Sequence, residues 1–283
     1  MKYIGYATAI LFVLFSAAPL FCQSPAHLKH TVVKTDRYDF GAGGTITITG
    51  APTGAIKVVG TGANEIEVTA TIELEAASAS DLAKLAEITG FVTQEGAIRS
   101  MISSIGPHNK FGLKKLPKKF PAHLLKLPFR IDYVITVPRY SNLEIDGGKG
   151  DLSVSGVEGS MEINFLETDG RVETGSGTTM ITIGTGTLDA DFGVRGWRGR
   201  SANIAVGTGR LNVRLPSTTS AEIDAIIVKT GSIENLLPDL KPRDRKVPFS
   251  EKSVIAKAGV GGSPLKFTVG DGSIKLELLS LPR

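Results

Sequence analysis

The chain has 283 residues, with 32 Lys and Arg against 28 Asp and Glu, 33 Gly and a single Cys. One cysteine excludes an intrachain disulfide framework and a cysteine-based zinc site. The formal net charge of +4 is too small to indicate a nucleic-acid partner. Charged residues at 21% and hydrophobic residues at 41% are typical of a folded globular protein, so we expect one with a substantial core.

The first residues have the pattern of an export signal. Lys2 is followed by an almost uninterrupted apolar run from Tyr3 to Phe21 and then by small and polar residues. This predicts a signal peptide over residues 1–26, cleaved after Ala26, and a protein located in the periplasm, at the cell surface or outside the cell. Two alternatives stay open: an uncleaved membrane anchor, because the run is nearly long enough to span a bilayer, and a lipoprotein acylated at Cys22.

The next segments are predicted in chain order as a tail, several strands and one helix. Residues 27–39 are expected to form an N-terminal tail, followed by a single β-repeat domain over 40–281. A helix and a basic loop are expected as an insertion over about 78–128. The helix is predicted from the spacing of its apolar residues over 80–88, with Ser78 or Ser80 as N-cap. Alternation of apolar residues predicts strands over 45–48, 55–59, 65–72, 91–93, 98–102 and 130–138.

The second half of the chain contains an internal repeat. Six segments place an apolar residue five positions before a glycine and another two positions after it. Alternation on both sides predicts strands with one buried face, and the glycine supplies the conformation that a turn needs. The six turn glycines are Gly150, Gly170, Gly186, Gly209, Gly231 and Gly272.

The repeat predicts an all-β fold. Units of roughly 20 residues cannot bury their apolar side chains alone, but stacked units bury a continuous interior. We therefore expect a β-solenoid or flattened β-roll of short strands punctuated by glycine, with one short helix in the N-terminal part. An ordinary β-sandwich is the alternative, because it also has a turn every 8–12 residues.

The serial units, together with Phe40–Ala55, the helical insertion and Tyr133–Pro138, resemble a family of exported bacterial β-strand-repeat proteins. This is the "putative adhesin" or head-GIN-like family. The resemblance covers roughly residues 40–278, and it carries no catalytic residue to transfer. It implies an exported protein that interacts with a surface or with the cell envelope.

Motifs for chemistry are missing from the sequence. It contains no G-x-S-x-G, H-E-x-x-H or P-loop pattern, so we expect no catalytic residue, no metal ligand and no cofactor. Aspartates at or near the expected turns are interpreted as solvated acids, with calcium binding as the alternative. These aspartates are Asp146, Asp151, Asp169, Asp189, Asp191 and Asp271.

Two basic patches are the candidate interaction sites. No acidic residue occurs between Gly96 and Arg130, where lysines are interleaved with apolar residues, a pattern that suits an anionic membrane surface or an acidic polysaccharide. A solvated connection that tucks its Leu and Phe side chains against the sheet is the alternative. In the second patch, the only Trp stands between arginines, where it either stacks on a partner or covers an edge of the stack. The candidate residues are Lys110, Lys114, Lys115, Lys118, Lys119 and Lys126, and Arg195, Trp197, Arg198 and Arg200.

These observations favour a non-enzymatic exported protein that presents a β-repeat scaffold for adhesion or macromolecular interaction. The expected partners are envelope or cell-surface macromolecules or an anionic membrane, and not nucleic acid. One alternative is an envelope-stress accessory that docks on anionic membrane through the basic loop. The other is a carbohydrate-active enzyme on a β-solenoid, whose carboxylates would meet only in the folded chain.

Overall fold

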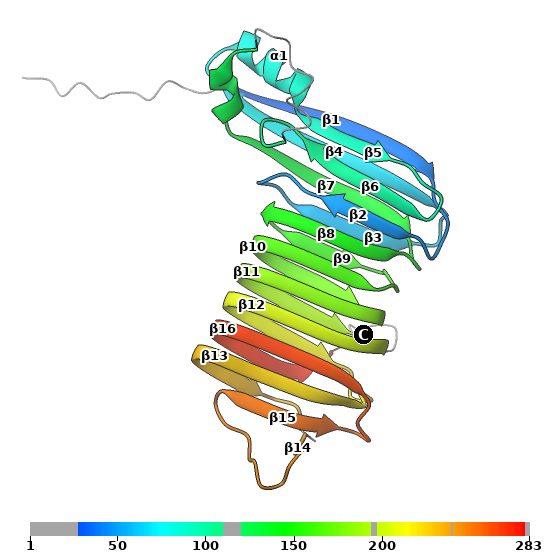
Figure 1. The fold of residues 1–283 in the computed structure, drawn as a ribbon, viewed down its shortest axis with the longest axis vertical. Coiled ribbons are helices and arrows are strands. Elements are labelled where there is room, and N and C mark those ends of the chain that lie inside the picture. The colour runs from blue at the N-terminus through cyan, green and yellow to red at the C-terminus, as the bar shows by residue number, and fades with distance from the viewer. Residues whose placement is uncertain (1–27, 110–119, 194–196, 239, 281–283) are drawn as a thin grey trace, which may run out of the picture.

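The structure, a computed structural model, describes residues 28–109, 120–193, 197–238 and 240–280. About two thirds of them belong to one sheet of 16 strands, so the predicted all-β class is confirmed (Figure 1). The predicted signal peptide over residues 1–26 lies outside the described residues.

The described residues of the N-terminal half form nine strands, one α-helix and one short 3-10 helix. The helix α1 has Ser78 as its N-cap, and the Ser78 hydroxyl accepts a hydrogen bond from the Asp81 amide. This confirms the predicted helix and one of its two predicted caps. The elements are β1 (Leu28–Asp39), β2 (Thr45–Thr49), β3 (Ile56–Thr61), β4 (Glu65–Ala76), α1 (Ala79–Ile88), β5 (Gly90–Gln94), β6 (Arg99–Ile105), η1 (Ala122–Lys126), β7 (Phe129–Pro138), β8 (Asn142–Lys149) and β9 (Leu152–Ser155).

The C-terminal half contains the long strands. Its elements are β10 (Met161–Thr174), β11 (Ser176–Phe192), β12 (Arg198–Leu215), β13 (Ala221–Asn235), β14 (Lys241–Pro242), β15 (Ser253–Ala258) and β16 (Ser263–Leu278). Neighbouring long strands pair in parallel, and antiparallel pairs occur only toward the two ends of the stack.

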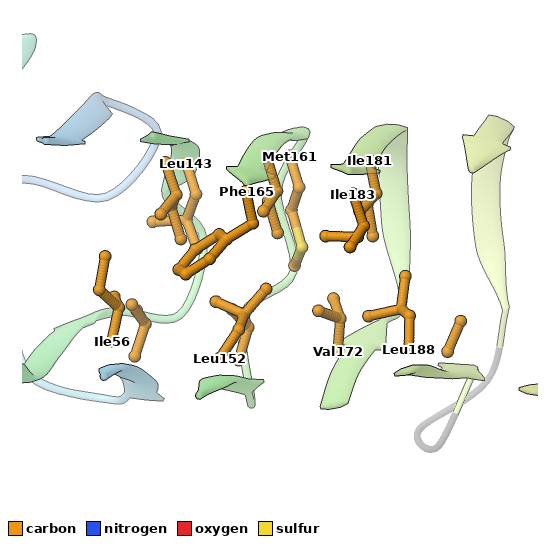
Figure 2. Packing of buried hydrophobic residues seen from close by; sticks show 14 of the residues in the cluster. Ile56, Leu143, Leu152, Met161, Phe165, Val172, Ile181, Ile183 and Leu188 are labelled. Carbon is orange, nitrogen blue, oxygen red and sulfur yellow. The ribbon is translucent and has the colours of Figure 1, made fainter. Parts of the chain in front are cut away.

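The sheet folds over on itself to form two facing layers. The first half of β10 pairs with β8 and its second half with β9, so this single strand contributes to both layers. Figure 2 shows the result: Met161, Phe165 and Ile181 project from one layer towards Leu152 and Val172 of the other. These side chains are almost completely buried, which gives the stack one continuous apolar interior.

A column of glycines marks the line at which the long strands bend. Gly186 pairs with Gly209, Gly209 with Gly272, and Gly272 with Gly231. All four have positive φ. A Cβ added at Gly209 would overlap the carbonyl oxygen of Gly186, so only glycine fits this close approach of successive strands.

One of the six predicted turn glycines is out of register with this column. Gly186 pairs with Thr168, whereas Gly170 pairs with Leu188. Gly170 does not have positive φ either. The assignment of Gly170 as an equivalent turn glycine was therefore wrong: the Asp-Gly-Arg sequence imitates the motif, but Thr168 occupies its place.

The predicted N-terminal tail over residues 27–39 was also wrong for 28–39, which form β1. This strand pairs along its whole length with β4. Its inward-facing positions include Lys34 and Asp36, so the usual apolar alternation is broken. Lys34 Nζ donates to the Thr89 carbonyl (2.9 Å), and the Thr93 hydroxyl donates to Asp36 (2.5 Å). Inward-pointing charges of this kind protect an edge strand from pairing with other chains.

The order of strands in space differs from their order along the chain. In the stack, β16 lies between β12 and β13 and is parallel to both (Figure 1). Near the other end, β2 lies between β6 and β8, and β3 lies between β7 and β9.

Candidate interaction surfaces

The basic loop is attached at the end of the stack that carries α1. Of its predicted interaction residues, Lys126 lies in the described part, at the end of η1, and is exposed. Leu124 of η1 is completely buried, and His123 lies 3.8 Å from Asp81 of α1. The predicted sites Lys110, Lys114, Lys115, Lys118 and Lys119 lie outside the described residues.

His108, at the start of the basic segment, is also packed against the stack. The His108 ring stacks on Phe129 with a centroid separation of 5.3 Å. Its partial burial lowers the pKa of the imidazole, because burial disfavours the charged form. With His108 on one side and Leu124 on the other, both flanks of the basic segment are held at the α1 end.

The aromatic ring of the second patch faces the protein. Trp197 contacts Phe192 edge to face at 5.0 Å, and it is only partly exposed. A Cβ at Gly199 would overlap the indole ring, so the ring lies directly over this glycine. The structure therefore places Trp197 as a cover over the edge of the core, which was one of the two interpretations open from the sequence.

The arginines on either side of Gly199 face the solvent. Arg198 and Arg200 are both exposed, and neither forms an ion pair within the described part of the chain. Arg200 is the extra residue of a bulge at the start of β12, which separates it from the regular ladder. Arg195, the third predicted arginine, lies outside the described residues.

The residues beside the glycine column form a regular polar surface, which we call the glycine ridge. Before the glycines stand Thr185, Thr208, Asp271 and Thr230, and after them stand Thr187, Arg210, Ser273 and Ser232. The ladder puts equivalent residues about 4.8 Å apart from strand to strand. The Thr230 hydroxyl donates to Asp271 (2.6 Å), which together with Lys229 lowers the pKa of that carboxyl. The glycines have a local sequence signal, but the ridge has none, because it exists only when the strands are in register.

Two of the predicted turn aspartates have a structural role instead. Asp189 and Asp191 lie within β11, and Asp191 is fully buried. Asp191 lies 2.7 Å from Arg171 Nη2 and 2.8 Å from Arg214 Nε, and Arg214 also pairs with Asp189. The positive charges of Arg171 and Arg214 balance the negative charge of the buried Asp191 carboxylate, because a charge that is removed from water needs a partner of opposite sign.

Possible metal ligands and surface hollows are the remaining features, and one open hollow of about 560 Å³ is lined by residues of β1 and β5, among them Lys34, Asp36 and Phe91. No group of three or more His, Cys, Asp or Glu within the described ranges is arranged to hold a metal ion. A pocket of about 90 Å³ near the β15 end is lined mainly by apolar side chains, among them Leu215, Leu237, Leu240 and Leu278. That volume suits one aliphatic side chain rather than a substrate, since ligand pockets usually exceed about 300 Å³.

Among the helices that the structure describes, none has both the length and the apolar character needed to span a bilayer.

Comparison with models of known protein families gives no match, and no curated protein matches the chain. Several solved structures are similar to it. A "putative cell adhesion protein" from Clostridium sporogenes has 10% identity and a TM-score of 0.39, over 88% of this chain and 100% of that one. A "putative adhesin" from Bacteroides fragilis has 11% identity and a TM-score of 0.26, over 88% and 97%. A "putative lipid binding protein" from Parabacteroides distasonis has 9% identity and a TM-score of 0.21, over 88% and 97%. Similarity at this level assigns no function to the chain.

Proposed function

We propose that the protein is a non-enzymatic, exported protein of the cell surface or envelope, and that its β-solenoid presents the glycine ridge for adhesion to a macromolecule. The observation that carries the proposal is the regularity of the ridge. Its polar groups recur about every 4.8 Å from strand to strand across β11, β12, β16 and β13. A straight ladder of hydrogen-bonding groups suits a polymer with repeated polar groups, such as a polysaccharide of the envelope.

The solenoid interpretation rests on the long strands. Each of β10, β11, β12 and β16 bends once and contributes to both layers, and each is in parallel register with its neighbours. This arrangement supports successive coils of one winding better than a sandwich of two separate sheets, in which strands commonly run antiparallel.

A second candidate function is docking on anionic membrane through the basic segment over 108–126. It is favoured by the position of β1, whose first residue Leu28 pairs with Ala76, close to the start of α1. The N-terminus of the described chain and the described flanks of the basic segment therefore lie at the same end of the stack (Figure 1). An uncleaved N-terminal anchor would place the lysines beside the membrane, where each contributes about 1 kcal/mol at an anionic surface.

One binding experiment separates the two candidates. Purified protein is incubated with envelope fractions, with neutral and acidic polysaccharides, and with vesicles of phosphatidylcholine alone or mixed with phosphatidylglycerol. If the ridge binds, Thr185→Val together with Thr208→Val weakens polysaccharide or envelope binding about tenfold, because two hydrogen bonds are lost. The matched control pair, Thr182→Val with Thr268→Val, lies on another outward column and leaves binding unchanged.

The membrane candidate predicts a different result from the same assay. Exchanging Lys114, Lys115, Lys118 and Lys119 for Gln then abolishes binding to the phosphatidylglycerol vesicles, whereas the ridge pair has no effect there. Adhesion through the ridge is contradicted if the variant with the two ridge substitutions and the control variant bind every surface equally. It is also contradicted if the unchanged protein binds none of the surfaces.

A further inference from the structure

We propose that β16 is an exchangeable strand: it leaves the slot between β12 and β13 of its own chain and fills the same slot in a second copy, so that two copies pair by reciprocal strand exchange. This inference does not depend on the proposed function, because it follows from the order of strands in the stack.

The slot is defined by two parallel ladders. Residues 202–215 of β12 pair with 265–278 of β16, and residues 221–235 of β13 pair with 263–276 on its other side. The inward side chains of β16, including Phe267 and Ile274, are completely buried. A strand that enters this slot therefore satisfies two open edges and fills one layer of the core.

The two edges of the slot share one register at the glycines, and β13 differs from β12 by one extra residue between Ile227 and Thr230. Gly209 of β12 and Gly231 of β13 both pair with Gly272, so they stand at the same position along their strands. When β16 leaves, β13 can pair directly with β12 in that register. The stack then becomes one strand shorter instead of keeping two exposed edges, which lowers the cost of release.

The connection between β12 and β13 has the length for both arrangements. Five residues, 156–160, connect β9 to β10, which are adjacent strands. Five residues, 216–220, connect β12 to β13, which are separated by β16. A connection of equal length thus spans one strand spacing in the first case and two in the second.

The segment that precedes β16 is suited to be a hinge. Residues 259–262 read Gly-Val-Gly-Gly, and the three glycines have φ values of 58°, 86° and 140°. Val260 is 83% exposed, so its side chain does not anchor the segment. Glycines absorb large changes of backbone angle, which opening of β16 requires.

A second copy of this chain fills the slot between β12 and β13, because its β16 has the same register, bend and buried side chains as the strand that the slot holds in the single chain. Reciprocal exchange gives a closed twofold dimer and reproduces every ladder of the single chain.

Full-length single-cysteine variants in a Cys22→Ser background test the exchange. Arg210 and Ser273 are register partners on β12 and β16, and neighbouring strands lie about 4.8 Å apart, within the range of a disulfide. Arg210→Cys protein is mixed with Ser273→Cys protein, incubated with warming, and oxidised with glutathione disulfide. Strand exchange predicts a disulfide-linked dimer of the two variants that accumulates with time and concentration.

The matched control keeps one partner and changes the other. Thr187 of β11 is the register partner of Arg210 on its opposite side, with the same spacing. Because β11 is not exchanged, Arg210→Cys mixed with Thr187→Cys should give severalfold less dimer. The proposal is overturned if the two mixtures give equal amounts.

A variant with a shortened hinge tests the same idea by another route. Ala258 and Ser263 both pair with Ala221 from opposite sides, so the hinge must bridge about 9.6 Å, two strand spacings. Deleting residues 260–262 leaves a reach of about 7.6 Å, two Cα–Cα steps. The shortened chain should elute as a dimer, whereas inserting Gly-Gly after Gly261 should leave a monomer. A folded monomer of the shortened chain would refute the exchange; if that chain does not fold, the cysteine mixtures decide.

Discussion

We expect Gly209→Ala to lower the free energy of unfolding by about 3–5 kcal/mol. Gly209 has a φ of 138°, which L-residues rarely adopt, and its added Cβ would overlap the Gly186 carbonyl oxygen. Neither strand can move away without breaking the parallel ladder between them. Urea unfolding followed by circular dichroism measures the change.

The matched control for this prediction is Gly170→Ala. Gly170 also lies in a long strand, but it does not have positive φ, and its added Cβ would lie 3.1 Å from the Leu152 Cβ. A small adjustment relieves that contact, and alanine is favoured over glycine within a strand, so we expect a change of about 1 kcal/mol or less. Equal destabilisation by the two substitutions would show that the glycine column does not determine the bend.

Phe267→Ala should lower the free energy of unfolding by about 3–5 kcal/mol, because it leaves a cavity in the middle of the stack. Phe267 is completely buried in β16 and contacts Phe192 of β11 edge to face at 5.8 Å. Phe192 in turn contacts Trp197, so the cavity would loosen the aromatic cover at the edge of the core. The urea midpoint reports the loss, and tryptophan fluorescence reports the loosening at Trp197.

Lys266→Ala is the control for this cavity. Lys266 precedes Phe267 on the same strand but faces outward and is exposed. Its substitution should change stability by less than about 0.5 kcal/mol. If Lys266→Ala costs as much as Phe267→Ala, the outward and inward faces of β16 have been assigned in reverse.

The local structure could be predicted from the sequence because it depends on neighbouring residues. Apolar alternation around Gly186 and Gly209 is enough to predict two strands and a bend, and the cap at Ser78 is enough to start the helix. The structure confirms the helix, its cap and the bends, but each bend lies within one continuous long strand, β11 or β12, and does not separate two short strands. It shows a different result at Gly170, where the local sequence has the motif but the ladder pairs Gly186 with Thr168.

What the sequence could not show depends on residues that are distant along the chain. The strand β1 was missed because its inward positions Lys34 and Asp36 are satisfied by partners more than 50 residues away. Asp191 was interpreted as a turn acid because its partners Arg171 and Arg214 lie on other strands. The insertion of β16 has no local signal at all, since β12, β16 and β13 carry the same repeat.

The position of β16 is tested most directly by two double-cysteine variants in the Cys22→Ser background, oxidised briefly at low concentration. Arg210→Cys with Ser273→Cys should form a disulfide within one chain rapidly, because β12 and β16 are neighbours about 4.8 Å apart. Arg210→Cys with Ser232→Cys should form one far more slowly, because β16 separates these residues by about 9.6 Å. If the second pair closes faster than the first, β13 is the neighbour of β12 and the stack described here is wrong.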